Sequence, residues 1–221
     1  MNAHPARHEG DTMKRFASIC TAATAVFRSV RTPTKHLATV ALILTLGVAF
    51  ADAQDQSVKL TFSGTSAPST INLQQPNTSN DGDTFAGKGT LGSFTVTNVR
   101  AISNSPGASS TCSGNNLLFL PELAGAGVFR FQDGSLLEVS LTRGGDCINL
   151  NNGVAHCDVT FQIIGGTGRF KYASGILTMT ETVATVASDA LGNPVLFAAR
   201  GKYTGTISGV ADTTAKIATN N

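Results

Sequence analysis

Nucleophilic catalysis that depends on histidine has a single candidate in the main part of the chain. His156 is the only histidine after residue 53, and it stands next to Cys157. A Ser-His-Asp or Cys-His site would have to use it, yet the sequence contains no G-x-S-x-G elbow. We therefore interpret His156 as an exposed loop histidine and predict no nucleophilic triad.

The sequence has few of the residue types and spacings that metal sites and nucleic-acid sites need. The cysteines have no C-x-x-C spacing, and residues 80–83 (NDGD) carry oxygen ligands without the later glutamate that a calcium loop needs. The chain has no tryptophan and only two tyrosines, so it offers few platforms for stacking bases. We predict no metal, no cofactor and no nucleic-acid partner.

Polar residues on the apolar side of predicted strands give a better lead. Glu181 continues the alternation of apolar side chains in residues 177–183. Asn98 and Arg100 continue the alternation that begins at Phe94. A regular strand would therefore point all three toward a buried face.

A carboxylate inside a barrel would have a raised pKa, or it would pair with a base such as Arg100. Such a group is the acid or base that a cofactor-free isomerase would use. Glu181 and Arg100 are thus the candidate catalytic residues, and Asn98 and Tyr203 are the candidate ligand contacts. In the alternative interpretation, Glu181 lies at a wet barrel mouth or forms a satisfied ion pair.

Three cysteines follow the N-terminal segment. Cys147 and Cys157 flank an Asn- and Gly-rich stretch, residues 148–156, with strand-like residues on both sides. A hairpin there would bring them together, so we predict a Cys147–Cys157 disulfide, with Cys112–Cys147 as the alternative.

Period-two alternation recurs along most of the chain after residue 54. The runs cover residues 58–62, 94–97, 128–131, 137–141, 159–163, 177–180 and 197–207. Glycine, serine and asparagine separate them, and no segment shows a sustained helical period. We predict an all-β fold of about eight strands in one domain, residues 54–221 with a core at 57–210. Residues 72–83 and 103–113 are predicted to be loops.

The N-terminal segment has the pattern of a secretory signal. A basic stretch precedes fourteen uncharged residues, 37–50, which are too few for a stable membrane anchor. Ala51-Asp52-Ala53 supplies a small-x-small cleavage site. We predict a signal peptide over residues 1–53, with Met13 as an alternative start. Its removal changes the net charge from +2 to −1, which gives no electrostatic preference for nucleic acid.

The most distinctive motif is GGTGRFKYASG, residues 165–175. Its key members are Gly165, Gly166, Gly168, Arg169 and Phe170. A strand is predicted to follow it, so no helix N-terminus would face a phosphate. We interpret the glycines as a tight bend, with Phe170 tucked into the end of the barrel.

This motif resembles a stretch of the allene oxide cyclase and dirigent proteins, and of bacterial secreted proteins with a similar barrel domain. The resemblance implies an eight-stranded antiparallel closed barrel with an apolar cavity. Plant members cyclise an epoxide or steer radical coupling without cofactors. The matched motif concerns the fold, so it transfers no pocket residues to this chain.

Two functions are compatible with this predicted barrel. In the first, the protein is a secreted or periplasmic, non-enzymatic barrel that holds a small apolar ligand or acts at the cell envelope. In the second, it is a cofactor-free isomerase or cyclase that works in the barrel cavity. A homo-oligomer is compatible with either function.

Overall fold

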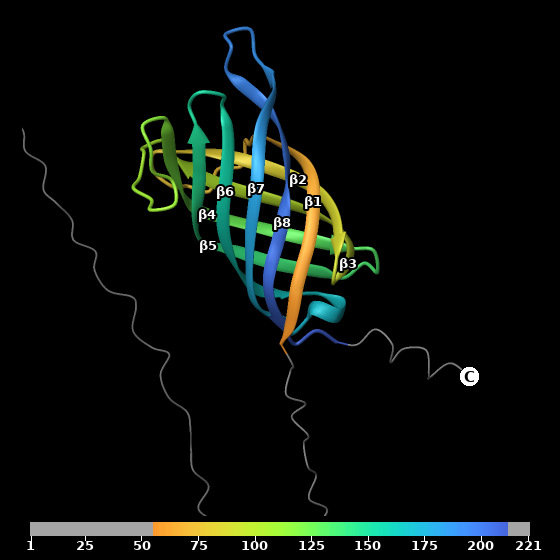
Figure 1. Cartoon of the computed structure of the whole chain (residues 1–221). Coiled ribbons are helices and arrows are strands. Elements are labelled where there is room, and N and C mark those ends of the chain that lie inside the picture. The colour runs from red at the N-terminus through yellow and green to blue at the C-terminus, as the bar shows by residue number, and fades with distance from the viewer. Residues whose placement is uncertain (1–54, 212–221) are drawn as a thin grey trace, which may run out of the picture. The chain divides into compact units, whose positions relative to one another are not determined.

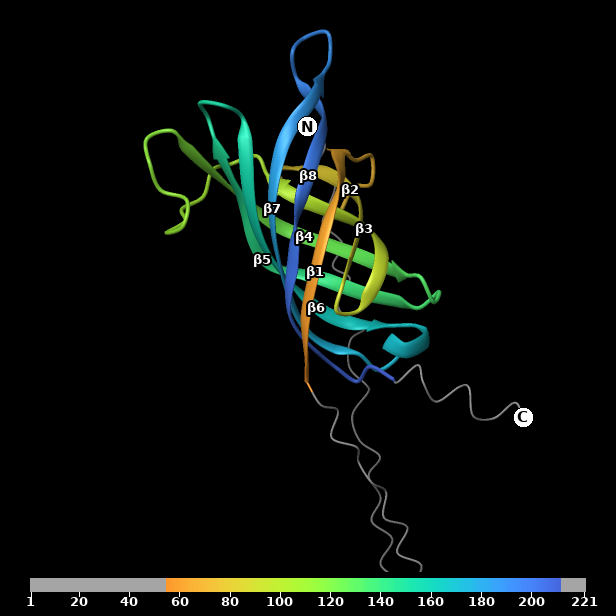
Figure 2. The ribbon, with the colours of Figure 1, turned by 45° about the vertical axis from the view of Figure 1, so that its right-hand side comes forward.

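The computed structural model describes residues 55–211, which form a closed antiparallel barrel of eight strands in chain order (Figures 1 and 2). The strands are β1 (Gln56–Pro68), β2 (Thr78–Gly89), β3 (Gly92–Ser103), β4 (Leu117–Phe131), β5 (Leu136–Asn149), β6 (Val154–Gly166), β7 (Ser174–Ser188) and β8 (Pro194–Ser208). The all-β barrel predicted from the sequence is thus confirmed. The expected signal peptide, with its cleavage after Ala53, lies outside the described residues.

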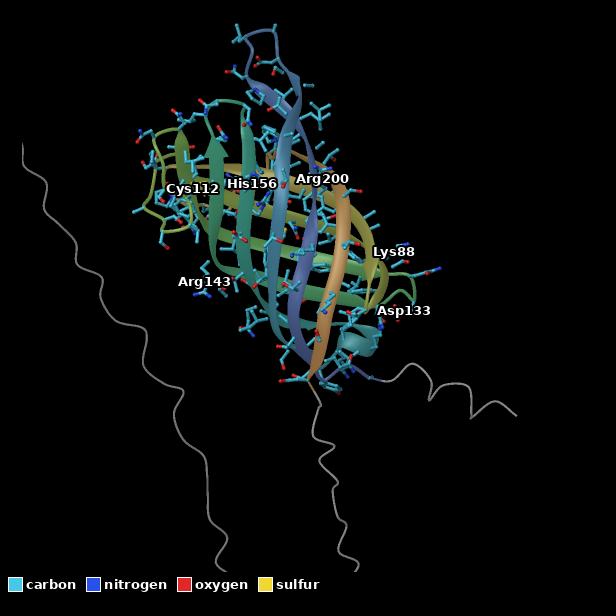
Figure 3. All side chains as sticks on the ribbon, in the orientation of Figure 1. Lys88, Cys112, Asp133, Arg143, His156 and Arg200 are labelled. Carbon is cyan, nitrogen blue, oxygen red and sulfur yellow. A yellow bond between two sulfur atoms is a disulfide. The ribbon has the colours of Figure 1, made fainter. Side chains whose placement is uncertain are left out.

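Alternation along each strand divides the side chains between an inner and an outer face. β1 closes the barrel against β8, where Leu60 lies opposite Tyr203 and both side chains are buried. Exposed polar side chains stand on the outer face, among them Arg143, His156 and Arg200 (Figure 3).

The two ends of the barrel differ. Three short connections, between β2 and β3, β4 and β5, and β6 and β7, meet at the end that we call the closed end. Aromatic residues fill the barrel from there to its middle, with ring centroids of neighbouring rings 4.6–6.5 Å apart. The buried rings are Phe62, Phe85, Phe94, Phe129, Phe131, Phe161, Phe170 and Tyr203.

The glycine motif forms the bend at the closed end, as predicted. Gly168 has a φ of 59°, a left-handed conformation that glycine adopts without strain, and it begins the short 3-10 helix η1 (Gly168–Phe170). Phe170 is fully buried and packs against Phe131. Arg169 donates to the Leu91 carbonyl and lies over both rings.

The opposite end, which we call the open end, carries the other four connections (residues 69–77, 104–116, 150–153 and 189–193). The β7–β8 hairpin extends beyond the rest of the barrel there (Figures 1 and 2). The predicted loop at 72–83 is only partly correct, because β2 already begins at Thr78. Among the described residues, no helix has the length and apolar character needed to cross a membrane.

The favoured disulfide was wrong, and the alternative is present. Cys112 bonds to Cys147 with a Cα–Cα distance of 5.5 Å, and Cys157 is a buried free thiol. Cys147 lies opposite His156 across the β5–β6 pair, so Cys157, one residue further along, points to the other face of the sheet. Cys157 therefore faces the barrel interior, away from the bonded pair.

Candidate functional site

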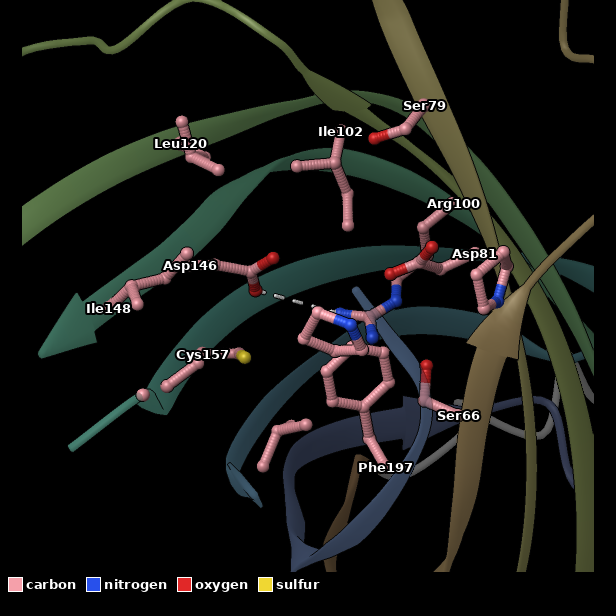
Figure 4. A pocket seen from close by; sticks show the side chains of 15 residues that line it. Ser66, Ser79, Asp81, Arg100, Ile102, Leu120, Asp146, Ile148, Cys157 and Phe197 are labelled. Carbon is pink, nitrogen blue, oxygen red and sulfur yellow. Dashed lines mark ion pairs between the residues drawn. The ribbon is translucent and has the colours of Figure 1, made fainter. Parts of the chain in front are cut away.

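The open end of the barrel contains a cavity of about 300 Å³, at the lower end of the range for small-molecule sites (Figure 4). We call it the open-end cavity. Its apolar walls come from Ile102, Leu120, Ile148, Val183 and Phe197, together with two prolines at the rim. Its polar lining comes chiefly from Ser66, Asp81, Arg100, Asp146 and Cys157. Buried aromatic rings fill the barrel from the closed end to its middle, so within the interior of the described barrel the open end offers room for a ligand.

Arg100 is the centre of a buried charged cluster beside the open-end cavity. Its side chain is 2% exposed, and its guanidinium contacts three carboxylates. Nε and Nη2 lie 2.8 and 3.1 Å from the two oxygens of Asp83, and Nη1 lies 2.7 Å from Glu122 Oε1. Nη2 also lies 3.1 Å from Glu181 Oε1. These contacts involve Nε, Nη1 and Nη2, so each guanidinium nitrogen lies close to at least one carboxylate.

Two further carboxylates, Asp81 and Asp146, line the open-end cavity itself. Asp146 Oδ1 lies 4.0 Å from Arg100 Nη1, the dashed line in Figure 4, which is the longest contact of the cluster. Asp81 lies opposite Arg100 in the β2–β3 ladder, and its carboxylate makes no hydrogen bond or ion pair with any other described residue. The cluster thus holds one cation against five acids.

This excess of acid keeps protons in the cluster near neutral pH. Burial raises the pKa of Glu122 to about 8 and that of Glu181 to about 7, although Arg100 opposes both shifts. Burial also raises the pKa of Asp81 to about 6, with further contributions from the Asp83 and Asp146 carboxylates. The pKa of the Cys157 thiol is raised by burial and by Asp146 and Glu181, so the thiol stays protonated. The site can therefore donate and accept protons close to pH 7.

The structure brings the two candidate catalytic residues together. Glu181 and Arg100 form one of the ion pairs described above, and only Arg100 of the two lines the open-end cavity. The two candidate ligand contacts lie deeper. Asn98 Nδ2 donates to the Tyr203 hydroxyl at 3.3 Å, both side chains are buried, and neither lines the open-end cavity.

Four acids of the cluster were missed by the sequence analysis. Asp81 and Asp83 lie in a stretch that was interpreted as a loop, although Asp83 has the alternation phase of the buried Phe85. Glu122 and Asp146 lie beyond irregularities in register, between Ala101 and Ile102 on β3 and between Leu141 and Arg143 on β5. Such irregularities reverse the expected face, so alternation alone would place these residues on the outside.

His156 plays no part in this cluster. It is exposed on the outer face of β6, where its Nδ1 lies 3.3 Å from the Thr182 hydroxyl. Within residues 55–211, no group of three histidine, cysteine, aspartate or glutamate side chains is arranged to hold a metal ion.

No protein-family model matches the chain, and no curated protein matches it. Among solved structures, the chain is similar to the pterocarpan synthase dirigent protein GePTS1, with 11% sequence identity and a TM-score of 0.34. The match covers 78% of this chain and 97% of that one. The bacterial origin that the glycine motif implied stays a prediction.

Proposed function

We propose that this protein is a non-enzymatic carrier that holds a small, largely apolar molecule in the open-end cavity. One observation carries the proposal: the barrel is packed with aromatic rings from its closed end to its middle, yet keeps a cavity of about 300 Å³ at the other end. The walls of that cavity are aliphatic and aromatic, and a few polar groups converge at its base. This combination is typical of small-molecule sites.

Export is part of the proposal. The N-terminal segment has the pattern of a signal peptide, and the Cys112–Cys147 disulfide is compatible with an oxidising compartment. A barrel that holds an apolar molecule there would keep it in solution outside the cytoplasm or at the cell envelope.

Proton-transfer catalysis is the second candidate, in the form of a cofactor-free isomerase or cyclase. It is favoured by the position of Asp81, which lines the open-end cavity and has a pKa raised to about 6. A group with a pKa near the working pH is suited to act as general acid or base. Arg100 could stabilise negative charge that develops on a bound molecule, although three acids already occupy it.

Native mass spectrometry of the full chain, purified from its own host, tests the proposal. We expect a bound small molecule that is released on unfolding, and the same spectra give the number of chains in the assembly. The matched variants are Ala155→Trp, which fills the open-end cavity, and Ala198→Trp, which places the same side chain on the outer face. Ala155→Trp should abolish binding of the small molecule, and Ala198→Trp should keep it.

An equal bound mass in both tryptophan variants would overturn the proposal, because the molecule would then bind elsewhere. Incubating the released molecule with fresh protein separates the two candidate functions. A carrier returns it unchanged, whereas an isomerase or cyclase converts it to, or from, a compound of the same mass with a different retention time.

A further inference from the structure

The charges at the base of the open-end cavity are unevenly distributed. Asp83, Glu122 and Glu181 are the acids closest to Arg100, and none of the three lines the cavity. The two acids that do line it, Asp81 and Asp146, are the two that the guanidinium does not closely contact. The cavity lining therefore carries two acids against one cation, Arg100, which three other acids already contact.

Unpartnered buried atoms face the same space. Ser66 is 2% exposed, and its Oγ is buried and accepts no hydrogen bond from any described residue. Asp146 is 8% exposed, and its Oδ1 likewise has no hydrogen-bond partner in the described part of the chain. Both residues line the open-end cavity, and Figure 4 shows the Ser66 oxygen directed into it. Ser66 lies on β1 and carries no charge, so it indicates a polar ligand group independently of the acids.

We propose that the open-end cavity selects a small molecule with an apolar body and a protonated amine as its head group, held by Asp81, Asp146 and the Ser66 hydroxyl. The inference rests on the proposed function, because it names the chemical class of the ligand in the same cavity. An ammonium group has three N–H donors, and its positive charge complements the negative charges of the lining carboxylates. Its apolar body lies against the walls formed by Ile102, Ile148 and Phe197.

A neutral or anionic head group fits this lining less well. A carboxylate would meet two like charges, and the one cation nearby is already shared among three acids. A hydroxyl could accept one hydrogen bond from Ser66 and donate one to a carboxylate, but it would leave the second lining carboxylate without a donor. An ammonium is also attracted to the carboxylates by its own positive charge, which a hydroxyl lacks, and this favours the ammonium.

The head group makes binding dependent on pH. The ionisable groups that face the base of the cavity come from six strands: Asp81 and Asp83 on β2, Arg100 on β3, Glu122 on β4, Asp146 on β5, Cys157 on β6 and Glu181 on β7. Protonated acids hold a cation less well than ionised ones do. Affinity for an amine should therefore rise with pH as the pKa of Asp81, about 6, and that of Glu181, about 7, are passed.

Isothermal titration with three probes of the same length tests the inference: n-hexylamine, 1-hexanol and hexanoate, each at pH 8. We expect hexylamine to bind at least about tenfold more tightly than hexanol, and hexanoate least tightly. Asp146→Asn should lower the affinity for hexylamine by about tenfold and leave hexanol unchanged. The matched control is Asp158→Asn, because Asp158 is exposed on the outer face of β6. It should change neither.

If Asp146→Asn does not fold, the pH series on the unmodified chain takes its place. Hexylamine should bind more tightly at pH 8 than at pH 5, and hexanol equally at both. If hexanol binds as tightly as hexylamine or more tightly, and Ala155→Trp abolishes that binding, the inference of an amine head group is overturned. The proposed function then stays intact. If no probe binds and Ala155→Trp also leaves the native bound mass unchanged, the proposed function fails as well.

Discussion

Replacing Glu181 with glutamine tests the protonation of the buried cluster. Glutamine keeps the size of the side chain and the acceptor oxygen that lies 3.1 Å from Arg100 Nη2, but it cannot ionise. It therefore mimics the protonated glutamic acid. We expect the variant to exceed the unmodified protein in stability by less than about 1 kcal/mol at pH 5 and by more at pH 8.

The size of the effect follows from the pKa of Glu181, which burial raises from 4.5 to about 7. Between these values the folded chain holds a proton that the unfolded chain releases, so stability falls as pH rises. The contribution is complete below pH 4.5 and is lost as pH passes 7. Each tenfold change in proton affinity corresponds to about 1.4 kcal/mol, so Glu181→Gln should gain about 3 kcal/mol at pH 8.

Urea unfolding followed by circular dichroism at pH 5, 6.5 and 8 measures this difference, because the chain lacks tryptophan. The disulfide should stay oxidised throughout. The control is Asp158→Asn, which removes an exposed acid from the neighbouring strand. Its free energy of unfolding should differ from that of the unmodified protein by the same amount at all three pH values. A Glu181→Gln variant that is less stable by the same amount at every pH would refute the reasoning, since Glu181 would then be needed in its ionised form.

Four other changes give distinct results. Arg100→Met leaves three buried acids without a cation and should cost about 3–5 kcal/mol at pH 8 but less at pH 5; an equal loss at both pH values would contradict this. Cys147→Ser opens a link between residues 35 positions apart and should cost about 4 kcal/mol in urea unfolding. Cys157→Ala should keep the Cys112–Cys147 disulfide in non-reducing peptide mapping. Loss of that disulfide in the variant would show that the pairing is wrong. Arg169→Ala should cost about 1–2 kcal/mol without changing hexylamine affinity, because Arg169 lies at the closed end; weakened binding would contradict that separation.

The sequence predicted the residues that lie on regular strands. Arg100 and Glu181 share the phase of their apolar neighbours without interruption, so alternation placed both inside the barrel. Phe170 was likewise placed correctly, because the glycine motif gives a local bend that depends on few distant contacts.

Residues beyond a register irregularity could not be placed in this way. Glu122 is out of phase with the buried Phe129 of its own strand, and Asp146 is out of phase with Val139. A bulge adds one residue to one strand of a pair and exchanges the two faces, and its position depends on the neighbouring strand. The same exchange turns Cys147 outward to Cys112, which a local hairpin argument could not anticipate.

Isoleucine methyl NMR during titration with n-hexylamine tests most directly whether the open end of the barrel is the binding site. Ile102 and Ile148 line the open-end cavity, whereas Ile163 and Ile207 are buried outside it. We predict that the methyl signals of Ile102 and Ile148 shift in proportion to the bound fraction and that those of Ile163 and Ile207 do not. Shifts confined to the exposed Ile176, or no shift under conditions where calorimetry shows binding, would contradict the account.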